Sequence, residues 1–122
     1  TRDFTYVLDL VQGLVKGGFY EEAIGENFNL AAGKEISISA MANMVNKTTG
    51  NEAEIVFKER RKWDTKPRLL ASIEKAEKLI KYKPIIDFEE GFNSNIKWFN
   101  DNWDLIQSLA DFKPGMNSAV RK

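Results

Sequence analysis

A shortage of strands is the feature of this sequence that most constrains its fold. Alternating, β-branched and aromatic residues predict three short strands, at Arg2–Val7, Asn27–Ala31 and Glu54–Phe57. Helical patterns separate and follow these strands, which is typical of an α/β organisation. Three short strands make a poor sheet by themselves. The sequence therefore predicts an α/β (or α+β-like) fragment with few short strands and four helices, whose sheet is completed by strands missing from the 122 residues.

The first two predicted helices are defined by their ends. Asp9 is placed to cap the first helix, because its carboxylate accepts hydrogen bonds from the free N–H groups of a first turn. Gly17 and Gly18 are expected to end it, since glycine adopts the left-handed conformation at low cost. Ser37 is the predicted cap of the second helix, which Gly50 stops.

The last two predicted helices differ in length. Ser72 opens a short helix that runs through Lys81. Asp87 and Glu90 are spaced as a capping box at the start of the longest helix, which extends for about 22 residues, or roughly 33 Å. Apolar side chains recur along it every three or four residues, as expected of a core-facing surface: Phe92, Ile96, Phe99, Trp103 and Ile106. The tail from Lys113 is expected to be irregular and then basic.

The composition excludes several kinds of site. The chain has neither cysteine nor histidine, which removes disulfides, thiolate chemistry, histidine-based triads and Cys- or His-ligated metal sites. Eighteen basic and eighteen acidic side chains cancel, so we expect neither nucleic acid nor a membrane as a partner. No apolar run approaches the roughly 18–20 residues of a membrane span, and no secretory signal opens the chain. A cytoplasmic location is the resulting expectation.

No catalytic residue can be identified from the residues alone. The hydroxyls and carboxylates form no arrangement that specifies a nucleophile with its base. The acidic pairs Glu21-Glu22 and Glu89-Glu90 are adjacent on helices, so their side chains point apart. Gly13, Gly17 and Gly18 lie in and after a helix, whereas a dinucleotide-binding loop follows a strand and precedes a helix.

The charged stretch Lys58–Arg68 is expected to be a loop that presents side chains. Arginine matches phosphate geometry with a planar fork of donors, so Arg61 is a candidate ligand for an anion. Asp64 is placed to accept bonds from ribose hydroxyls. Trp63 between them either covers the face of a base or sugar or plugs the domain surface. On chemistry alone this stretch is more simply a solvated loop.

Six short motifs follow one another along nearly the whole chain. They resemble the RDF-x-YV-x-D, N-L-x-x-G, R-x-x-D, KA, Y/W-x-P and EEGL segments of extended short-chain dehydrogenase/reductase proteins that act on nucleotide sugars. The residues that carry the resemblance are Arg2-Asp3-Phe4-Thr5-Tyr6-Val7 with Asp9, Asn29–Gly33 with Ile36-Ser37-Ile38, Arg61-Lys62-Trp63-Asp64, Lys75-Ala76, Tyr82-Lys83-Pro84, and Glu89-Glu90-Gly91-Phe92 with Trp98-Phe99.

The resemblance implies a role for three side chains. Arg2 and Arg61 are expected to contact the diphosphate of a nucleotide sugar, and Asp64 its ribose. Residues 1–122 then form the C-terminal substrate-binding portion of an NAD-dependent nucleotide-sugar epimerase similar to UDP-glucose 4-epimerase. The NAD-binding Rossmann portion, with the catalytic Ser/Thr and Tyr-x-x-x-Lys, is absent. NAD is therefore expected in the full-length parent and not on this fragment, which should be inactive alone.

Alternatives and departures from the pattern remain. A fragment of a nucleotide-sugar 4,6-dehydratase and a non-catalytic binding or interaction module are the other readings.

Lys81 stands where the family usually has glycine, at a cost of about 1–2 kcal/mol if its backbone is left-handed. Trp63 replaces a residue that is often glycine. The surface that would pack on the missing portion is expected to be apolar, which predicts self-association or a homodimer.

Overall fold

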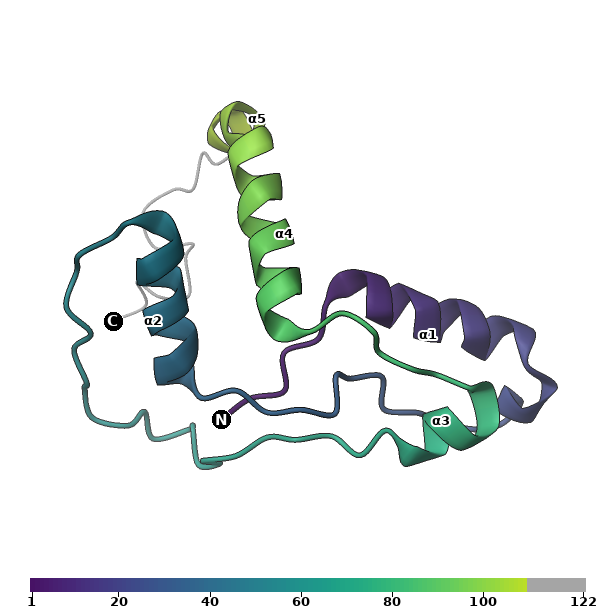
Figure 1. Cartoon of the computed structure of the whole chain (residues 1–122). Helices are drawn as coiled ribbons and strands as arrows, with labels where there is room; N and C mark the ends of the chain where they lie inside the picture. The colour runs from purple at the N-terminus through teal and green to yellow at the C-terminus, as the bar shows by residue number, and fades with distance from the viewer. Residues whose placement is uncertain (110–122) are drawn as a thin grey trace. The chain divides into compact units, whose positions relative to one another are not determined.

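Helices joined by long extended segments make up the computed structural model, which describes residues 1–109 (Figure 1). The predicted tail from Lys113 lies outside the described residues. The chain divides into two compact parts, residues 1–91 and residues 92–122. In chain order the described elements are α1 (Val7–Phe19), the 3-10 turn η1 (Glu21–Ala23), α2 (Ile38–Thr49), α3 (Glu74–Ile80), α4 (Phe88–Asp101) and α5 (Trp103–Leu109).

The predicted sheet is wrong for the part of the chain that the structure describes. Residues 1–109 contain no strand, and the β-type pairing there is one antiparallel bridge, in which Arg2 and Ile36 exchange two backbone hydrogen bonds of 2.9 Å. The segments Asn27–Ala31 and Glu54–Phe57 run without secondary structure. Local β preference requires a neighbouring strand to complete a ladder of hydrogen bonds. Among the described residues these segments have none.

Helix α1 differs from its prediction at both ends. It begins at Val7, so Asp9 lies inside the first turn and is buried rather than capping the helix. The Asp9 carboxylate instead accepts the backbone N–H groups of Ile85 and Ile86, at 3.0 and 3.1 Å. Gly17 and Gly18 do not end the helix, which continues to Phe19. The carboxylate is thus committed to a loop distant in sequence.

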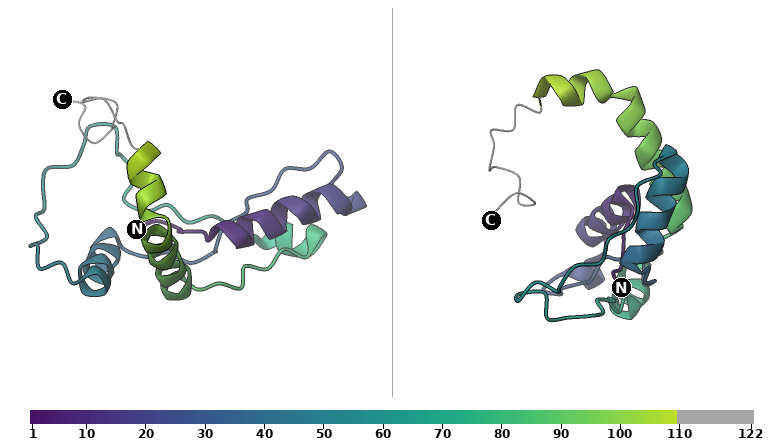
Figure 2. Two further views of the ribbon diagram at one scale, coloured as in Figure 1. Left: turned by 90° about the horizontal axis from the view of Figure 1, so that it is seen from above. Right: turned by 90° about the vertical axis from the view of Figure 1, so that its left-hand side faces the viewer.

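Helix α2 confirms its predicted ends. The Ser37 hydroxyl accepts the backbone N–H of Ala40 at 3.0 Å, which satisfies one free donor of the first turn. Gly50 terminates the helix with a φ of +66°, a left-handed conformation that favours glycine. Figures 1 and 2 show α2 at the opposite end of the first part from α1 and α3.

The core of the first part lies where α3 and its exit segment pack against α1 and η1. Ala76, Ile80 and Tyr82 are its buried members. The residues that pack around them are partly buried: Tyr20, Ala23, Phe28, Leu30, Ile73 and Leu79. Phe28 and Leu30 alternate along one side of an extended segment, so that segment keeps the side-chain pattern of a strand without its ladder.

The end of α3 has a residue in the left-handed conformation, one of the two possibilities that the sequence left open there. Lys81 has a φ of 53° and a ψ of 34°. Every other described residue with a positive φ is glycine. The side-chain amine of Lys16 donates a hydrogen bond to the Lys81 carbonyl. The left-handed turn directs the following residue, Tyr82, into the core.

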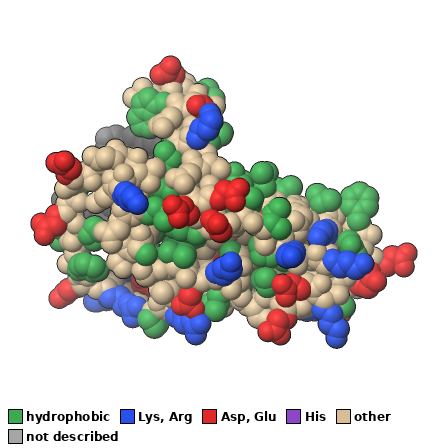
Figure 3. Space-filling model, in the orientation of Figure 1, with side chains coloured by type: hydrophobic (Ala, Val, Ile, Leu, Met, Phe, Trp, Pro, Cys, Tyr) green, Lys and Arg blue, Asp and Glu red, His purple; other side chains and the backbone are tan. Residues whose placement is uncertain are grey.

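Helix α1 carries its apolar side chains away from the core of its own part. Its buried positions are Asp9 and Gly13, and Gln12 accepts the backbone N–H of Lys83 at 3.2 Å. The opposite side, which we call the outer face of α1, is exposed and consists of Val7, Leu10, Val11, Leu14 and Val15. Figure 3 shows hydrophobic side chains gathered along this helix. An exposed apolar stripe of this kind marks a surface that packs on something else.

The predicted longest helix is divided in two. The Asp87 carboxylate caps α4 by accepting the N–H of Glu90 at 2.9 Å, which is one of the two bonds of the predicted capping box. The helix stops at Asp101, and α5 begins two residues later at Trp103. At the break, the Asn102 side chain donates a hydrogen bond of 2.8 Å to the carbonyl of Trp98. The backbone N–H of Asn102 also donates to the Trp98 carbonyl, at 3.0 Å, so this carbonyl accepts two hydrogen bonds at the break.

Candidate functional site

Two of the three predicted site residues meet in the structure. The Arg2 guanidinium forms an ion pair with the Asp64 carboxylate, with 3.0 Å between Nη2 and Oδ1. The two residues are 62 positions apart in the sequence. Their side chains are 28% and 34% exposed, so a solute can reach both. Arg2 also donates from Nη1 to the Thr1 carbonyl at 2.7 Å and, at 3.4 Å, to that of Lys66.

The third predicted residue, Arg61, lies in the same turn as Asp64. The backbone N–H of Asp64 donates to the Arg61 carbonyl at 3.0 Å, which closes the turn. The Arg61 guanidinium lies over the ring of Trp63, 5.2 Å from its centroid. The loop therefore places Arg61, Trp63 and Asp64 in one short segment, with the Arg61 guanidinium over an aromatic face.

The loop around these residues is strongly basic. Six lysine and arginine side chains stand against two acidic ones between residues 58 and 68. Basic side chains gather over this loop at the lower left of Figure 3. The ion pair with Asp64 neutralises Arg2, while the remaining cations create a local positive field on a chain of zero net charge. Such a field favours an anionic ligand.

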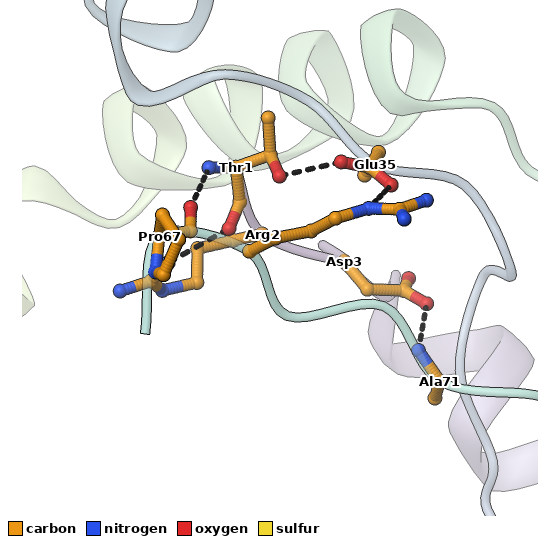
Figure 4. Close-up of polar contacts among 7 residues, drawn as sticks. Thr1, Arg2, Asp3, Glu35, Pro67 and Ala71 are labelled. Atoms are coloured by element: carbon orange, nitrogen blue, oxygen red, sulfur yellow. Dashed lines mark hydrogen bonds and ion pairs between the residues drawn. The ribbon is translucent and has the colours of Figure 1, made fainter. Parts of the chain in front are cut away.

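The Asp3 carboxylate positions the segments next to Arg2. It accepts backbone N–H groups from Ala32 at 3.0 Å, from Gly33 at 3.1 Å and from Ala71 at 3.4 Å. Figure 4 shows Asp3 directed toward Ala71. Gly33 has a φ of +68°, which suits the turn that presents these N–H groups. Asp3 thus fixes two loops against the segment that carries Arg2.

Glu35 forms a second support, on the other side of the same segment. It accepts a hydrogen bond of 2.5 Å from the Thr1 hydroxyl (Figure 4). It also pairs with the Arg68 guanidinium. The hydrogen bond from Thr1, followed by that from Arg68, lowers the pKa of Glu35 below its ordinary value. Glu35 therefore stays ionised and ties the end of the basic loop to the start of the chain.

Sequence reasoning missed these supporting roles of Asp3 and Glu35. The partners of Asp3 lie 29 to 68 residues away, and Arg68 is 33 residues from Glu35. Helix caps and turns are found from short spacings, and neither carboxylate has such a spacing to its partner. The one available signal was the position of Asp3 next to Arg2 in the first of the six motifs.

Two surface cavities flank the turn at Ala32, with volumes of about 380 and 620 Å³. Lys34 and Pro84 line both of them. None of Arg2, Arg61 and Asp64 lines either cavity. The candidate ligand contacts therefore lie on an open loop surface rather than inside one of these cavities.

Residues 1–109 contain neither the glycine-rich turn of a dinucleotide site nor a cluster of metal ligands. Gly13, Gly17 and Gly18 are inside α1, and no glycine-rich turn joins a strand to a helix there. The described residues hold no group of three or more His, Cys, Asp or Glu side chains able to bind a metal ion. In the same part of the chain, no helix has the length and hydropathy to cross a membrane.

Comparison with known proteins shows which proteins this chain resembles. No family model matches the chain. It is 34% identical over 110 residues to the UDP-glucuronate 4-epimerase of Thermodesulfobacterium geofontis, covering 88% of the chain and 33% of that protein. Curated relatives also include UDP-glucuronic acid decarboxylases. The chain thus spans about a third, or less, of the length of the curated relatives it matches.

Solved structures agree with the sequence relatives. The epimerase Mth375 of Methanothermobacter thermautotrophicus is 45% identical, with a TM-score of 0.86 over 90% of this chain and 33% of that one. The Bordetella bronchiseptica enzyme WbmF, in complex with NAD⁺ and UDP, is 30% identical with a TM-score of 0.70, over 88% of this chain and 31% of that one. The chain belongs to the extended short-chain dehydrogenase/reductase family. Within it, the chain is homologous to a portion of the nucleotide-sugar epimerases and decarboxylases.

Proposed function

We propose that this chain supplies part of the sugar-nucleotide site of an NAD-dependent nucleotide-sugar epimerase, acting on a UDP-hexose. The observation that carries the proposal is the ion pair between Arg2 and Asp64. It joins a candidate diphosphate ligand to a candidate ribose ligand across 62 residues of sequence. The UDP bound by WbmF and the UDP-sugars in the names of the relatives support the choice of ligand.

The contact of Arg2 with Asp64 can give way to a contact of Arg2 with a ligand. A partly exposed ion pair contributes about 0–1 kcal/mol to stability. A hydrogen bond from a guanidinium to a phosphate is worth roughly 1.5–3 kcal/mol, and arginine can make two in parallel. A diphosphate therefore competes favourably with Asp64 for Arg2. Asp64, once released, accepts hydrogen bonds from the two ribose hydroxyls.

Arg61 provides the second positive charge. It lies three residues from Asp64, in the turn closed by the Asp64–Arg61 backbone bond. Its contact with Trp63 is a cation–π interaction, worth about 0.5–1 kcal/mol at an exposed site. A diphosphate offers Arg61 stronger bonds than the indole does. Arg2 and Arg61 then approach one diphosphate from two segments of the chain.

The reaction itself belongs to residues outside this chain. Hydride transfer between sugar and NAD requires the cofactor and a proton acceptor. Residues 1–109 have no glycine-rich turn between a strand and a helix to bind the dinucleotide. The relatives include epimerases and decarboxylases at the same identity of 34%, so the shared portion suits the nucleotide rather than one reaction. We expect no turnover of UDP-glucose by the 122-residue chain with added NAD.

Titration of the chain with UDP, followed by calorimetry or NMR, tests the site. Arg61→Ala should weaken UDP binding by roughly tenfold or more, because one charge-assisted bond to phosphate is lost. Arg60→Ala is the matched control, since it removes the same charge from the neighbouring position. Equal losses of UDP affinity in the two variants would mean that the loop acts through its overall positive charge and not through Arg61 in particular. Unchanged affinity in Arg61→Ala would remove Arg61 from the site.

A further inference from the structure

Trp63 is the feature of the basic loop that the diphosphate and ribose contacts leave unexplained. It is 73% exposed, so it does not plug the surface of its own part of the chain. An indole is large and apolar, and leaving it in water forgoes the free energy of its burial. Its described ring contact is with the Arg61 guanidinium, which lies over the ring. A side chain placed in this way is a platform for a ligand with a flat face.

The position of Trp63 in the turn selects the part of the ligand that it meets. It is bonded directly to Asp64, the candidate ribose ligand, and lies two residues from Arg61. In a nucleotide sugar the base is attached to the ribose, whereas the hexose lies beyond the diphosphate. An aromatic side chain adjacent to the ribose ligand therefore meets the base before the hexose.

Building on the proposed function, we infer that Trp63 stacks on the nucleobase of the bound nucleotide. Every base has a π-face, so an indole adds affinity without selecting one base over another. The positive field of the loop attracts the phosphates. The Arg61 guanidinium, 5.2 Å from the centroid of the Trp63 ring, belongs to the same turn and binds them there. Trp63 consequently orients the base end of the nucleotide and Arg61 the phosphate end.

Fluorescence of Trp63 provides a direct test. The chain has three tryptophans, so Trp98→Phe with Trp103→Phe leaves Trp63 as the sole indole. Both replaced residues lie in the second part of the chain and are about half exposed. With excitation at the red edge of indole absorption, UDP should quench Trp63 on binding. Pyrophosphate and ribose 5-phosphate, which lack a base, should bind without comparable quenching.

Affinity measured in the otherwise unaltered chain gives an independent readout. Trp63→Ala should weaken UDP by roughly tenfold, the effect expected when one base loses its stacking partner. Trp63→Phe should restore most of that loss. Pyrophosphate should bind all three chains equally, because it makes no use of the ring. The exposed indole makes Trp63→Ala a mild change for folding, which far-UV circular dichroism checks.

The outcomes separate this inference from the function on which it rests. If UDP binds and depends on Arg61, but neither quenches Trp63 nor weakens in Trp63→Ala, stacking is overturned and the proposed site stands. If quenching needs UDP-glucose and is absent with UDP, Trp63 faces the hexose and the inference is wrong. If the unaltered chain binds neither UDP nor pyrophosphate, both proposals fail together.

Discussion

The Tyr82 hydroxyl donates a hydrogen bond of 3.0 Å to the carbonyl oxygen of Ala31, across 51 residues of sequence. Tyr82 is 1% exposed and follows directly on the left-handed Lys81. Its ring packs with Ile80 and Ala76 in the core, while its hydroxyl satisfies a carbonyl of the extended segment. The bond does for Ala31 what a neighbouring strand would do in a sheet.

Replacing Tyr82 with phenylalanine should destabilise the fold by about 1 kcal/mol and remove an alkaline transition. Burial, and after it the charges of Asp9 and Asp3, raise the pKa of Tyr82. The folded state therefore holds this proton more tightly than the unfolded state. Its contribution to stability is complete below an ordinary tyrosine pKa of about 10 and is lost as pH rises through the folded value. Urea unfolding at about pH 9 and about pH 11 measures the loss; an equal loss in the phenylalanine variant would contradict it.

Two glycines of α1 should respond in opposite ways to alanine. A Cβ at Gly13 would lie 2.6 and 2.8 Å from the methyl carbons of Leu30 and 3.0 Å from the Tyr82 ring. Gly13→Ala should therefore cost about 1–3 kcal/mol through overpacking. A Cβ at Gly17 meets nothing within 4 Å. Gly17→Ala should stabilise by roughly 0.5–1 kcal/mol through helix propensity.

Thermal unfolding of the two alanine variants, side by side, measures this difference. Both gain the same helix propensity, so the gap between them isolates the contact of α1 with Leu30 and Tyr82. Similar melting temperatures for the two would show that α1 does not pack on this core.

Glycine at position 81 should stabilise the chain. The left-handed conformation costs Lys81 about 1–2 kcal/mol, which glycine avoids. Glycine loses more backbone entropy on folding, so the net gain expected is at most about 1 kcal/mol. Lys83→Gly is the control, because Lys83 does not have positive φ. Stabilisation of both variants, or of neither, in denaturant titrations would exclude backbone strain as the cause.

The outer face of α1 should drive self-association of the chain. Leu14, at its centre, is 61% exposed and is flanked by Val7, Leu10, Val11 and Val15. A lysine at position 14 places a charge in this stripe and should shift the chain toward monomer in sedimentation experiments. Ile24→Lys alters an equally apolar residue that is 82% exposed and lies outside the helix. A monomeric unaltered chain, or an equal effect of the two lysines, would contradict the prediction.

Elements with local end signals could be predicted from the sequence. Ser37 and Gly50 define α2 because the hydrogen bond of the cap spans three residues and the left-handed stop is a property of glycine. The break at Asn102 was missed, because apolar side chains recur through it with helical spacing.

Elements that depend on distant partners could not be predicted. Asp9 has the chemistry of a helix cap, but its carboxylate oxygens accept hydrogen bonds from N–H groups 76 and 77 residues away. The three strand predictions were wrong because local β preference says nothing about whether a partner strand is present. In the candidate site, the Arg61–Asp64 turn is local, whereas the ion pair of Arg2 with Asp64 was not predicted. The resemblance implied only that both residues contact the same nucleotide sugar. The ligand roles of all three remain predictions.

The bonds of Asp3 and Asp9 to backbone amides have a consequence for tolerance to mutation. Both carboxylates accept hydrogen bonds from main-chain N–H groups. The side chains of the residues that donate these N–H groups therefore contribute little to the interaction. Ile85, for example, is 68% exposed while its amide is held by Asp9. Such a position accepts most residues and rejects proline, which has no N–H. A saturation scan should show two strictly acidic positions, Asp3 and Asp9, opposite positions such as Ile85 that vary freely in everything except proline, while Gly33 stays glycine because of its positive φ.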